Sequence, residues 1–247
     1  MGLASDLWWN PLESGMGWTL SEHASGQAFV VWYRYDAQGN PIWYVMPGGT
    51  WTDDTTFHGT LYKTHGPPFF QGPFDPARVT STAIGDATLA FSDGSNATFT
   101  YSLANGEHGT KSITRQLFGT AAPGDPLSVA DLWWNPRESG WGFAVSQQGA
   151  KVFAAWFIYD ANGEPTWLVM PTAELRAAVG ALLTGQYAFG GNLYTTHGPP
   201  STGPFDPAKV VPTVVGTGFV SFSNGAGALQ YTVSGQSGQR DISRQPF

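Results

Sequence analysis

Short segments of alternating hydrophobic and polar residues, separated by turn residues, make up most of the chain. Residues 17–23 and 27–35 alternate in this way on either side of Ala24-Ser25-Gly26, a pattern typical of a β-hairpin. Residues 36–39 begin with Asp and end with Gly, which predicts a turn into a strand over 41–46. The same alternation predicts further strands over residues 56–63, 80–84, 88–92, 97–103 and 111–118.

Seven or eight short strands in the first half of the chain predict an all-β domain. Tight turns join most of them, which favours a small antiparallel barrel of meander topology. An immunoglobulin-like sandwich is the alternative, although its Greek-key crossings need longer connections than most of those present.

The second half of the chain repeats the first, motif by motif. Segments 6–15 and 131–140 are identical at nine of ten positions, and Gly-Pro-Phe-Asp-Pro-Ala occurs at 72–77 and again at 203–208. The motif Thr-His-Gly-Pro-Pro is also present twice, as is a frame Tyr-Asp-Ala-x-Gly-x-Pro-x-Trp. We therefore predict a tandem duplication, with one barrel in residues 1–118, a Gly/Ala/Pro-rich linker in 119–126 and a second barrel in 127–247.

The second copy carries about eight extra residues after Met170-Pro171. Hydrophobic residues within residues 173–183 recur at helical spacing, which predicts one short helix packed between the barrels or across a barrel mouth. Because such a helix would restrict access to the second copy, we expect copy one to hold the more accessible pocket. Copy one also offers three further side chains for stacking and hydrogen bonding: Trp51, His58 and His108.

Charged residues are few and mostly acidic, and this narrows the possible partners. The chain has 247 residues, of which 18 are acidic and 11 basic, giving a net charge of −7. Without a basic cluster to neutralise phosphates, nucleic acid is not expected as a partner. The absence of cysteine excludes disulfides and thiolate metal sites, and no apolar stretch is long enough for a helical membrane span. We expect no cofactor, and the oligomeric state stays open.

Two motifs in each copy resemble a repeat found in exported proteins of proteobacteria. Glu-Ser-Gly-x-Gly occupies residues 13–17 and 138–142, and Tyr-Asp-x-x-Gly-x-Pro-x-Trp occupies 35–43 and 159–167. The resemblance covers most of each copy and implies an exported all-β protein, extracellular or periplasmic. By architecture alone, a small barrel with a ligand in its mouth is also similar to lipocalin-like and avidin-like folds.

Tryptophans are unusually frequent, with 11 in the chain, and four of them form adjacent pairs before an Asn-Pro turn. These four candidate ligand-binding residues are Trp8, Trp9, Trp133 and Trp134. Adjacent strand residues face opposite sides, so one ring of each pair is expected in the core and the other outside. An exposed ring would stack on a sugar or an aromatic ligand, whereas the alternative is that both rings plug a barrel end. Trp43 and Trp167 lie mid-strand and are predicted to fill the barrel interior.

Glutamate and histidine supply the remaining candidates. Glu13 and Glu138 lie in turns near the tryptophan pairs, where a carboxyl group acts as general acid or accepts a ligand hydroxyl. The alternative is a structural carboxylate bound to backbone amides or to Arg115 and Arg244.

His65 and His197 precede Gly-Pro-Pro, whose prolines stiffen the loop as in a rigid binding site. A hydrogen-bonded structural role is the alternative for both histidines. No second histidine lies at a metal-ligand spacing, so no metal site is predicted.

Three functions are compatible with these residues. The favoured one is an exported noncatalytic binding protein for a carbohydrate or another ring-shaped small molecule, since Trp-rich pockets in two copies would give avidity. A glycosidase or lyase would need Glu13 or Glu138 with a second carboxyl group roughly 5–10 Å away, from Asp36 or from the other copy. A structural or adhesive repeat protein is the third possibility.

Overall fold

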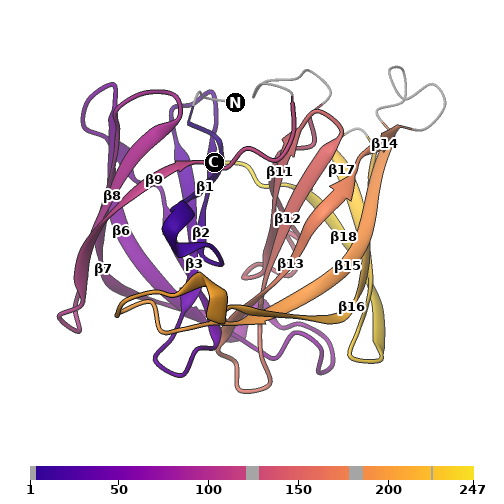
Figure 1. The fold of residues 1–247 in the computed structure, drawn as a ribbon. Coiled ribbons are helices and arrows are strands. Elements are labelled where there is room, and N and C mark those ends of the chain that lie inside the picture. Colours follow the sequence, from indigo (N-terminus) through magenta and orange to yellow (C-terminus); the bar gives the residue numbers. More distant parts are fainter. Residues whose placement is uncertain (1–3, 121–127, 178–185, 224) are drawn as a thin grey trace.

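The computed structural model describes residues 4–120, 128–177, 186–223 and 225–247, which form two closed eight-stranded antiparallel β-barrels (Figure 1). Barrel 1 contains β1 (Asp6–Trp9), β2 (Gly17–Glu22), β3 (Ala28–Tyr35), β4 (Pro41–Pro47), β6 (Thr56–His65), β7 (Thr80–Phe91), β8 (Asn96–Leu103) and β9 (His108–Arg115), with the short β5 (Thr50–Trp51) at its rim. Barrel 2 contains β10 (Asp131–Trp134), β11 (Gly142–Gln148), β12 (Lys151–Tyr159), β13 (Pro165–Glu174), β15 (Tyr187–His197), β16 (Val211–Ser223), β17 (Ala226–Val233) and β18 (Gln236–Arg244), with β14 (Arg176–Ala177) at its rim.

The strand order confirms a meander rather than a sandwich. In each barrel the main strands pair with their neighbours in sequence, and the first strand pairs with the last, β1 with β9 and β10 with β18. The β4–β6 and β13–β15 pairings complete the two barrels. Both halves share this order, so the predicted tandem duplication of barrels is confirmed. Residues 121–126 of the predicted linker lie outside the described residues.

Two strand predictions need correction. Segments 80–84 and 88–92 belong to one continuous strand, β7, which bends at Gly85 instead of ending there. Gly85 has a φ of +148° and lies against the carbonyl oxygen of Ser102, so the bend requires glycine. The segment Asp6–Trp9 was not predicted as a strand, yet as β1 it closes the barrel.

The helix predicted over residues 173–183 is wrong for its first part. Ala173 and Glu174 end β13 by pairing with β12, and Arg176–Ala177 form β14 by pairing with β15. Ladder hydrogen bonds to these neighbouring strands satisfy this backbone, which overrides the weak helical periodicity. The rest of the predicted helix lies outside the described residues.

The two barrels face each other and exchange loops (Figure 1). The β6–β7 loop of barrel 1 contains η2 (Pro76–Arg78), and the β15–β16 loop of barrel 2 contains η3 (Pro207–Lys209). Figure 1 shows the β15–β16 loop, in orange, crossing the lower part of barrel 1. The contacts are reciprocal: the amide of Gly66 donates to the carbonyl of Gly163 at 3.1 Å, and the amide of Gly198 donates to that of Gly39 at 3.1 Å.

Aromatic side chains repeat this reciprocity. Phe74 stacks on Tyr159 with ring centroids 6.3 Å apart, and Phe205 stacks on Tyr35 at 6.1 Å. These phenylalanines belong to the repeated Gly-Pro-Phe-Asp-Pro-Ala segment and the tyrosines to the repeated Tyr-Asp frame. The motifs that the copies share therefore include those that join the barrels.

The loops differ in one respect that changes the barrel interiors. Copy one carries Phe69 and Phe70 after its Gly-Pro-Pro segment, where copy two carries Ser201 and Thr202. Phe69 is fully buried against Trp156 of barrel 2, with ring centroids 5.1 Å apart. The loop of barrel 1 therefore plugs one end of barrel 2 with Phe69, and the loop of copy two has no aromatic residue at the equivalent positions.

Trp43 and Trp167 are buried as predicted, but they face the seam, which is the interface between the two barrels, instead of a barrel interior. The indole nitrogen of Trp43 donates to the carbonyls of Ile158 at 3.2 Å and Thr166 at 3.1 Å, both in barrel 2. Trp167 packs its ring against Tyr33 of barrel 1, with centroids 5.6 Å apart.

Candidate functional site

The tryptophan pairs split between interior and exterior as the strand alternation predicts. Trp8 and Trp133 are each 1% exposed, and their indole nitrogens donate to the carbonyls of Ala4 at 3.0 Å and Val129 at 2.9 Å. Their neighbours Trp9 and Trp134 are partly exposed. Trp134 lines a cavity of about 190 Å³ in the seam between the barrels, together with Trp43 and Trp141 among others.

Glu13 and Glu138 occupy equivalent positions, and each binds a basic side chain from the last strand of its own barrel. The Lys111 ammonium donates to both carboxylate oxygens of Glu13, at 2.7 and 2.8 Å. Glu138 lies 3.1 Å from Nε of Arg240 and accepts the indole N–H of Trp141 at 3.2 Å. These ion pairs match the structural alternative, although the partners are not the expected Arg115 and Arg244.

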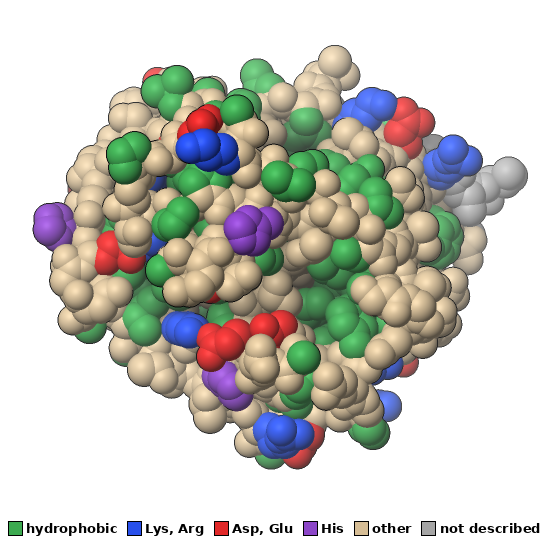
Figure 2. Space-filling view, turned by 60° about the horizontal axis from the view of Figure 1, so that its bottom comes forward, with side chains coloured by type: hydrophobic (Ala, Val, Ile, Leu, Met, Phe, Trp, Pro, Cys, Tyr) green, Lys and Arg blue, Asp and Glu red, His purple; other side chains and the backbone are tan. Residues whose placement is uncertain are grey.

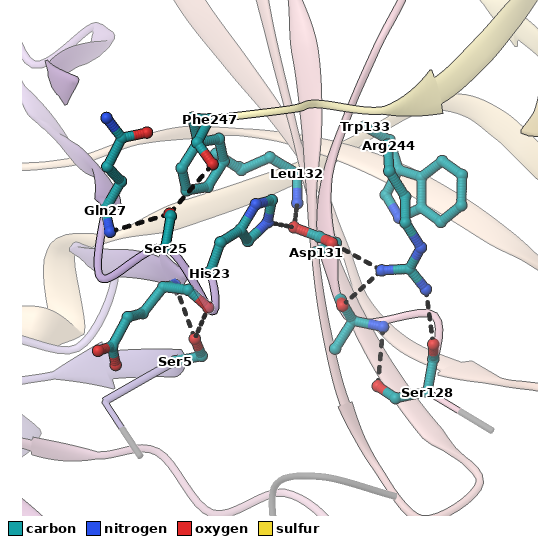
Figure 3. Close-up of polar contacts among 12 residues, drawn as sticks. Ser5, His23, Ser25, Gln27, Ser128, Asp131, Leu132, Trp133, Arg244 and Phe247 are labelled. Carbon is teal, nitrogen blue, oxygen red and sulfur yellow. Dashed lines mark hydrogen bonds and ion pairs between the residues drawn. The ribbon is translucent and has the colours of Figure 1, made fainter. Parts of the chain in front are cut away.

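Those two arginines bind aspartates at the starts of β1 and β10. Arg115 donates to Asp6 at 2.9 Å, and Arg244 donates to Asp131 at 2.7 Å (Figure 3). Asp131 also lies 3.0 Å from Nε2 of His23 in barrel 1, so this aspartate links the two barrels.

The predicted binding histidines form part of the interface between the barrels. Nε2 of His65 lies 3.1 Å from the carbonyl oxygen of Asn162, and Nε2 of His197 lies 3.1 Å from that of Gln38. Gly163, with a φ of +81°, leaves the room that the His65 ring occupies, since a Cβ there would lie 2.5 Å from Cε1 of the imidazole. The rigid loops therefore position these histidines against the other barrel.

Figure 2 shows few charged side chains on the face at the bottom of Figure 1, and its blue and red groups mostly lie next to each other. The ion pair of Lys63 with Glu164 also crosses between the barrels, at 2.6 Å.

Sequence reasoning missed a buried ion pair inside barrel 1. The guanidinium of Arg34 is 2% exposed and lies 2.7 Å from the carboxylate of Glu107, with its Cζ 4.4 Å from the centre of the Trp32 ring. In copy two the equivalent positions hold Ile158 and Gln236. An arginine within the apolar segment Ala-Phe-Val-Val-Trp-Tyr-Arg-Tyr was the available signal.

The mouth of barrel 1, the open end beside Ala4 and the rim strand β5, forms a cavity of about 540 Å³. Three aromatic side chains line it: Trp8, Trp51 and Phe91. The Phe91 ring contacts Trp8 edge-on with centroids 5.2 Å apart, and Trp51 at 5.8 Å. Trp51 therefore lines the same cavity as Trp8, which was predicted to bind a ligand. His58 and His108, the other side chains that copy one was expected to offer, do not line this cavity.

Four carboxylates and one guanidinium also line the mouth: Glu22, Asp53, Asp54, Asp93 and Arg115. Asp53 and Asp93 each accept backbone amides of their own turns, from Thr55 at 2.8 Å and from Ser95 at 2.7 Å. The Thr55 amide lowers the pKa of Asp53, and the Asn96 side chain lowers that of Asp93. Both groups are therefore anionic at neutral pH.

A larger hollow of about 910 Å³ lies on barrel 2, but it is a weaker candidate. It is bordered by Arg176 in β14, the strand that directly precedes the undescribed residues 178–185, and includes outward-facing strand residues such as Thr217 and Phe219. The comparison of accessibility between the two copies stays a prediction, because the inserted segment is described only in part.

Neither a metal centre nor a known relative guides the assignment. Within the described part of the chain, no three His, Asp or Glu side chains lie close enough to hold a metal ion, and no helix there has the length and apolarity to cross a membrane. No family model, curated protein or solved structure matches the chain. Its function is therefore inferred from geometry.

Proposed function

We propose that the protein is a noncatalytic binding protein that takes a ring-shaped polar molecule, such as a carbohydrate, into the mouth of barrel 1. The observation that carries this proposal is the 540 Å³ cavity lined by Trp8, Trp51 and Phe91 and ringed by carboxylates. Small-molecule sites have volumes of about 300–1,000 Å³ and combine apolar walls with a few polar groups.

The chemistry of the cavity suits a sugar ring. The faces of indole and phenyl rings stack on the C–H face of a sugar, and the carboxylates accept its hydroxyl groups. The strands and turns that hold these side chains are hydrogen-bonded in place, so the site is formed before a ligand arrives.

The experiment is isothermal titration calorimetry of the full chain with a panel of mono- and disaccharides, repeated on matched tryptophan variants. Trp51→Leu removes one wall of the mouth and is expected to weaken binding at least tenfold. Trp134→Leu removes a partly exposed tryptophan of the seam cavity and is expected to leave affinity unchanged.

Three results would contradict the proposal: no binding across the panel, unchanged affinity in Trp51→Leu, or loss of binding in Trp134→Leu alone. The last of these would place the site in the seam. Because Trp51 also packs on Phe57, with centroids 5.3 Å apart, thermal melting of each variant accompanies the titration.

A further inference from the structure

We infer that the ligand of the barrel 1 mouth carries a positive charge, as in an amine-bearing sugar ring, an inference that rests on the proposed function. The mouth holds four carboxylates, whereas its single guanidinium, that of Arg115, is already bound to Asp6 at 2.9 Å. That guanidinium also donates to the carbonyls of Ser5 and Gly94, at 3.0 Å each. Among the lining residues, negative charge therefore exceeds positive charge.

The carboxylates differ in how far the protein uses them. Asp53 and Asp93 accept hydrogen bonds within their own turns. Glu22 and Asp54, by contrast, have no hydrogen-bond or ion-pair partner among the described residues for their carboxylate groups. Groups without a partner retain their full capacity to bind a ligand cation.

In copy two, neutral residues occupy the positions of two of these carboxylates. At the positions of Glu22 and Asp93, copy two carries the neutral Gln147 and Asn224, which have nearly the same shape. The Gln147 side chain is used structurally, because its oxygen accepts the amide of Val129 at 2.8 Å and its nitrogen donates to Gly149 at 2.9 Å. Charge at these positions is thus peculiar to the mouth of barrel 1.

The aromatic walls favour a cation as well. A ring face attracts a cation within about 6 Å of its centre, more strongly as water is excluded. The Arg115 guanidinium already lies 4.9 Å from the Trp8 ring and shows this interaction within the mouth. Trp51 and Phe91 supply further rings beside the carboxylates, which together form a surrounding suited to an alkylammonium group.

The test compares three sugars that share one ring and differ at a single carbon: glucosamine, N-acetylglucosamine and glucose. Calorimetry of the full chain below the pKa of the amine is expected to give glucosamine at least tenfold tighter binding than the two neutral sugars. The advantage should shrink as salt is raised, because screening weakens exposed charge pairs.

The double variant Glu22→Gln/Asp93→Asn gives barrel 1 the residues of copy two. It is expected to remove most of the advantage of glucosamine over glucose. The control, Glu174→Gln/Asp206→Asn, removes the same net charge at exposed positions of barrel 2 and should change nothing.

Equal affinity for all three sugars would overturn the charge inference and leave the proposed function standing. Retention of the full glucosamine advantage in Glu22→Gln/Asp93→Asn, with melting confirming an intact fold, would also overturn it. Binding of none of the three sugars, together with no binding across the wider panel, would overturn the proposed function itself.

Discussion

Replacing Glu107 by glutamine should destabilise barrel 1 far more than the loss of a surface ion pair. The carboxylate of Glu107 is 15% exposed and its partner Arg34 is 2% exposed, so Glu107→Gln leaves a guanidinium buried without its counter-ion. Two nitrogens of that guanidinium, Nε and Nη1, already have no hydrogen-bond partner among the described residues. Breaking a buried pair from one side costs about 3–5 kcal/mol, and the partial exposure of Glu107 favours the lower end, about 3 kcal/mol.

The double variant Arg34→Met/Glu107→Gln separates the cost of the unpaired charge from the loss of packing. Replacing both members of a buried pair by groups of similar volume is often neutral, so we expect stability within about 1 kcal/mol of the parent. Copy two supports this expectation, since Ile158 and Gln236 stand at these positions. The single variant should therefore be rescued by a second substitution.

Urea unfolding at neutral pH, followed by circular dichroism, measures these differences. For a chain of this size, 3 kcal/mol corresponds to a fall in Tm of roughly 6–12 °C. The control is Glu174→Gln, which breaks an exposed pair with Lys151 and should cost under about 1 kcal/mol. A loss below 1 kcal/mol in Glu107→Gln, or additive losses in the double variant, would refute the reasoning.

Three further predictions concern the seam and the plugged barrel. Phe69→Ala should cost about 3–5 kcal/mol by opening a cavity in barrel 2, whereas the 46% exposed Phe219→Ala should cost little in the same melting assay. Trp43→Ala should cost a similar 3–5 kcal/mol, whereas Trp43→Phe should cost about 1 kcal/mol because it loses the hydrogen bonds of the indole nitrogen. An unchanged unfolding midpoint in Trp43→Ala would contradict the burial of this side chain. Burial raises the pKa of Tyr35 and of Tyr159 to about 12, whereas the unfolded chain loses these protons near pH 10. The free energy of unfolding should therefore fall between pH 10 and 12 by up to about 1.4 kcal/mol per pH unit for each tyrosine. Urea midpoints that stay constant over this pH range would disprove this.

Fold class and topology were predictable because they depend on local patterns. Alternation and turn residues specify where strands begin and end, and short connections leave a meander as the simplest way to pair them. Prediction failed where tertiary pairing decides the outcome. Asp6–Trp9 is too short for alternation to show, and residues 173–177 became strands through pairing with β12 and β15.

The site was less predictable, because a sequence repeated within one chain has two possible explanations. His65 and His197 recur with their rigid loops, which fits a duplicated binding site as well as a contact between the copies. The structure shows the contact. Trp51 could be predicted as a binding residue only because it lacks a counterpart. The carboxylates of the mouth come from the end of β2 and from two turns, which are distant in sequence.

The exchange of loops between the barrels also limits how many copies such a chain can usefully hold. Each copy offers one loop and one receiving turn, and within the described residues both are occupied by the other copy. A reciprocal contact of this kind is closed, as in a two-fold symmetric dimer, and does not extend to a third member. Growth by further duplication would therefore have to proceed in pairs, unlike solenoid repeats, which add one unit at a time.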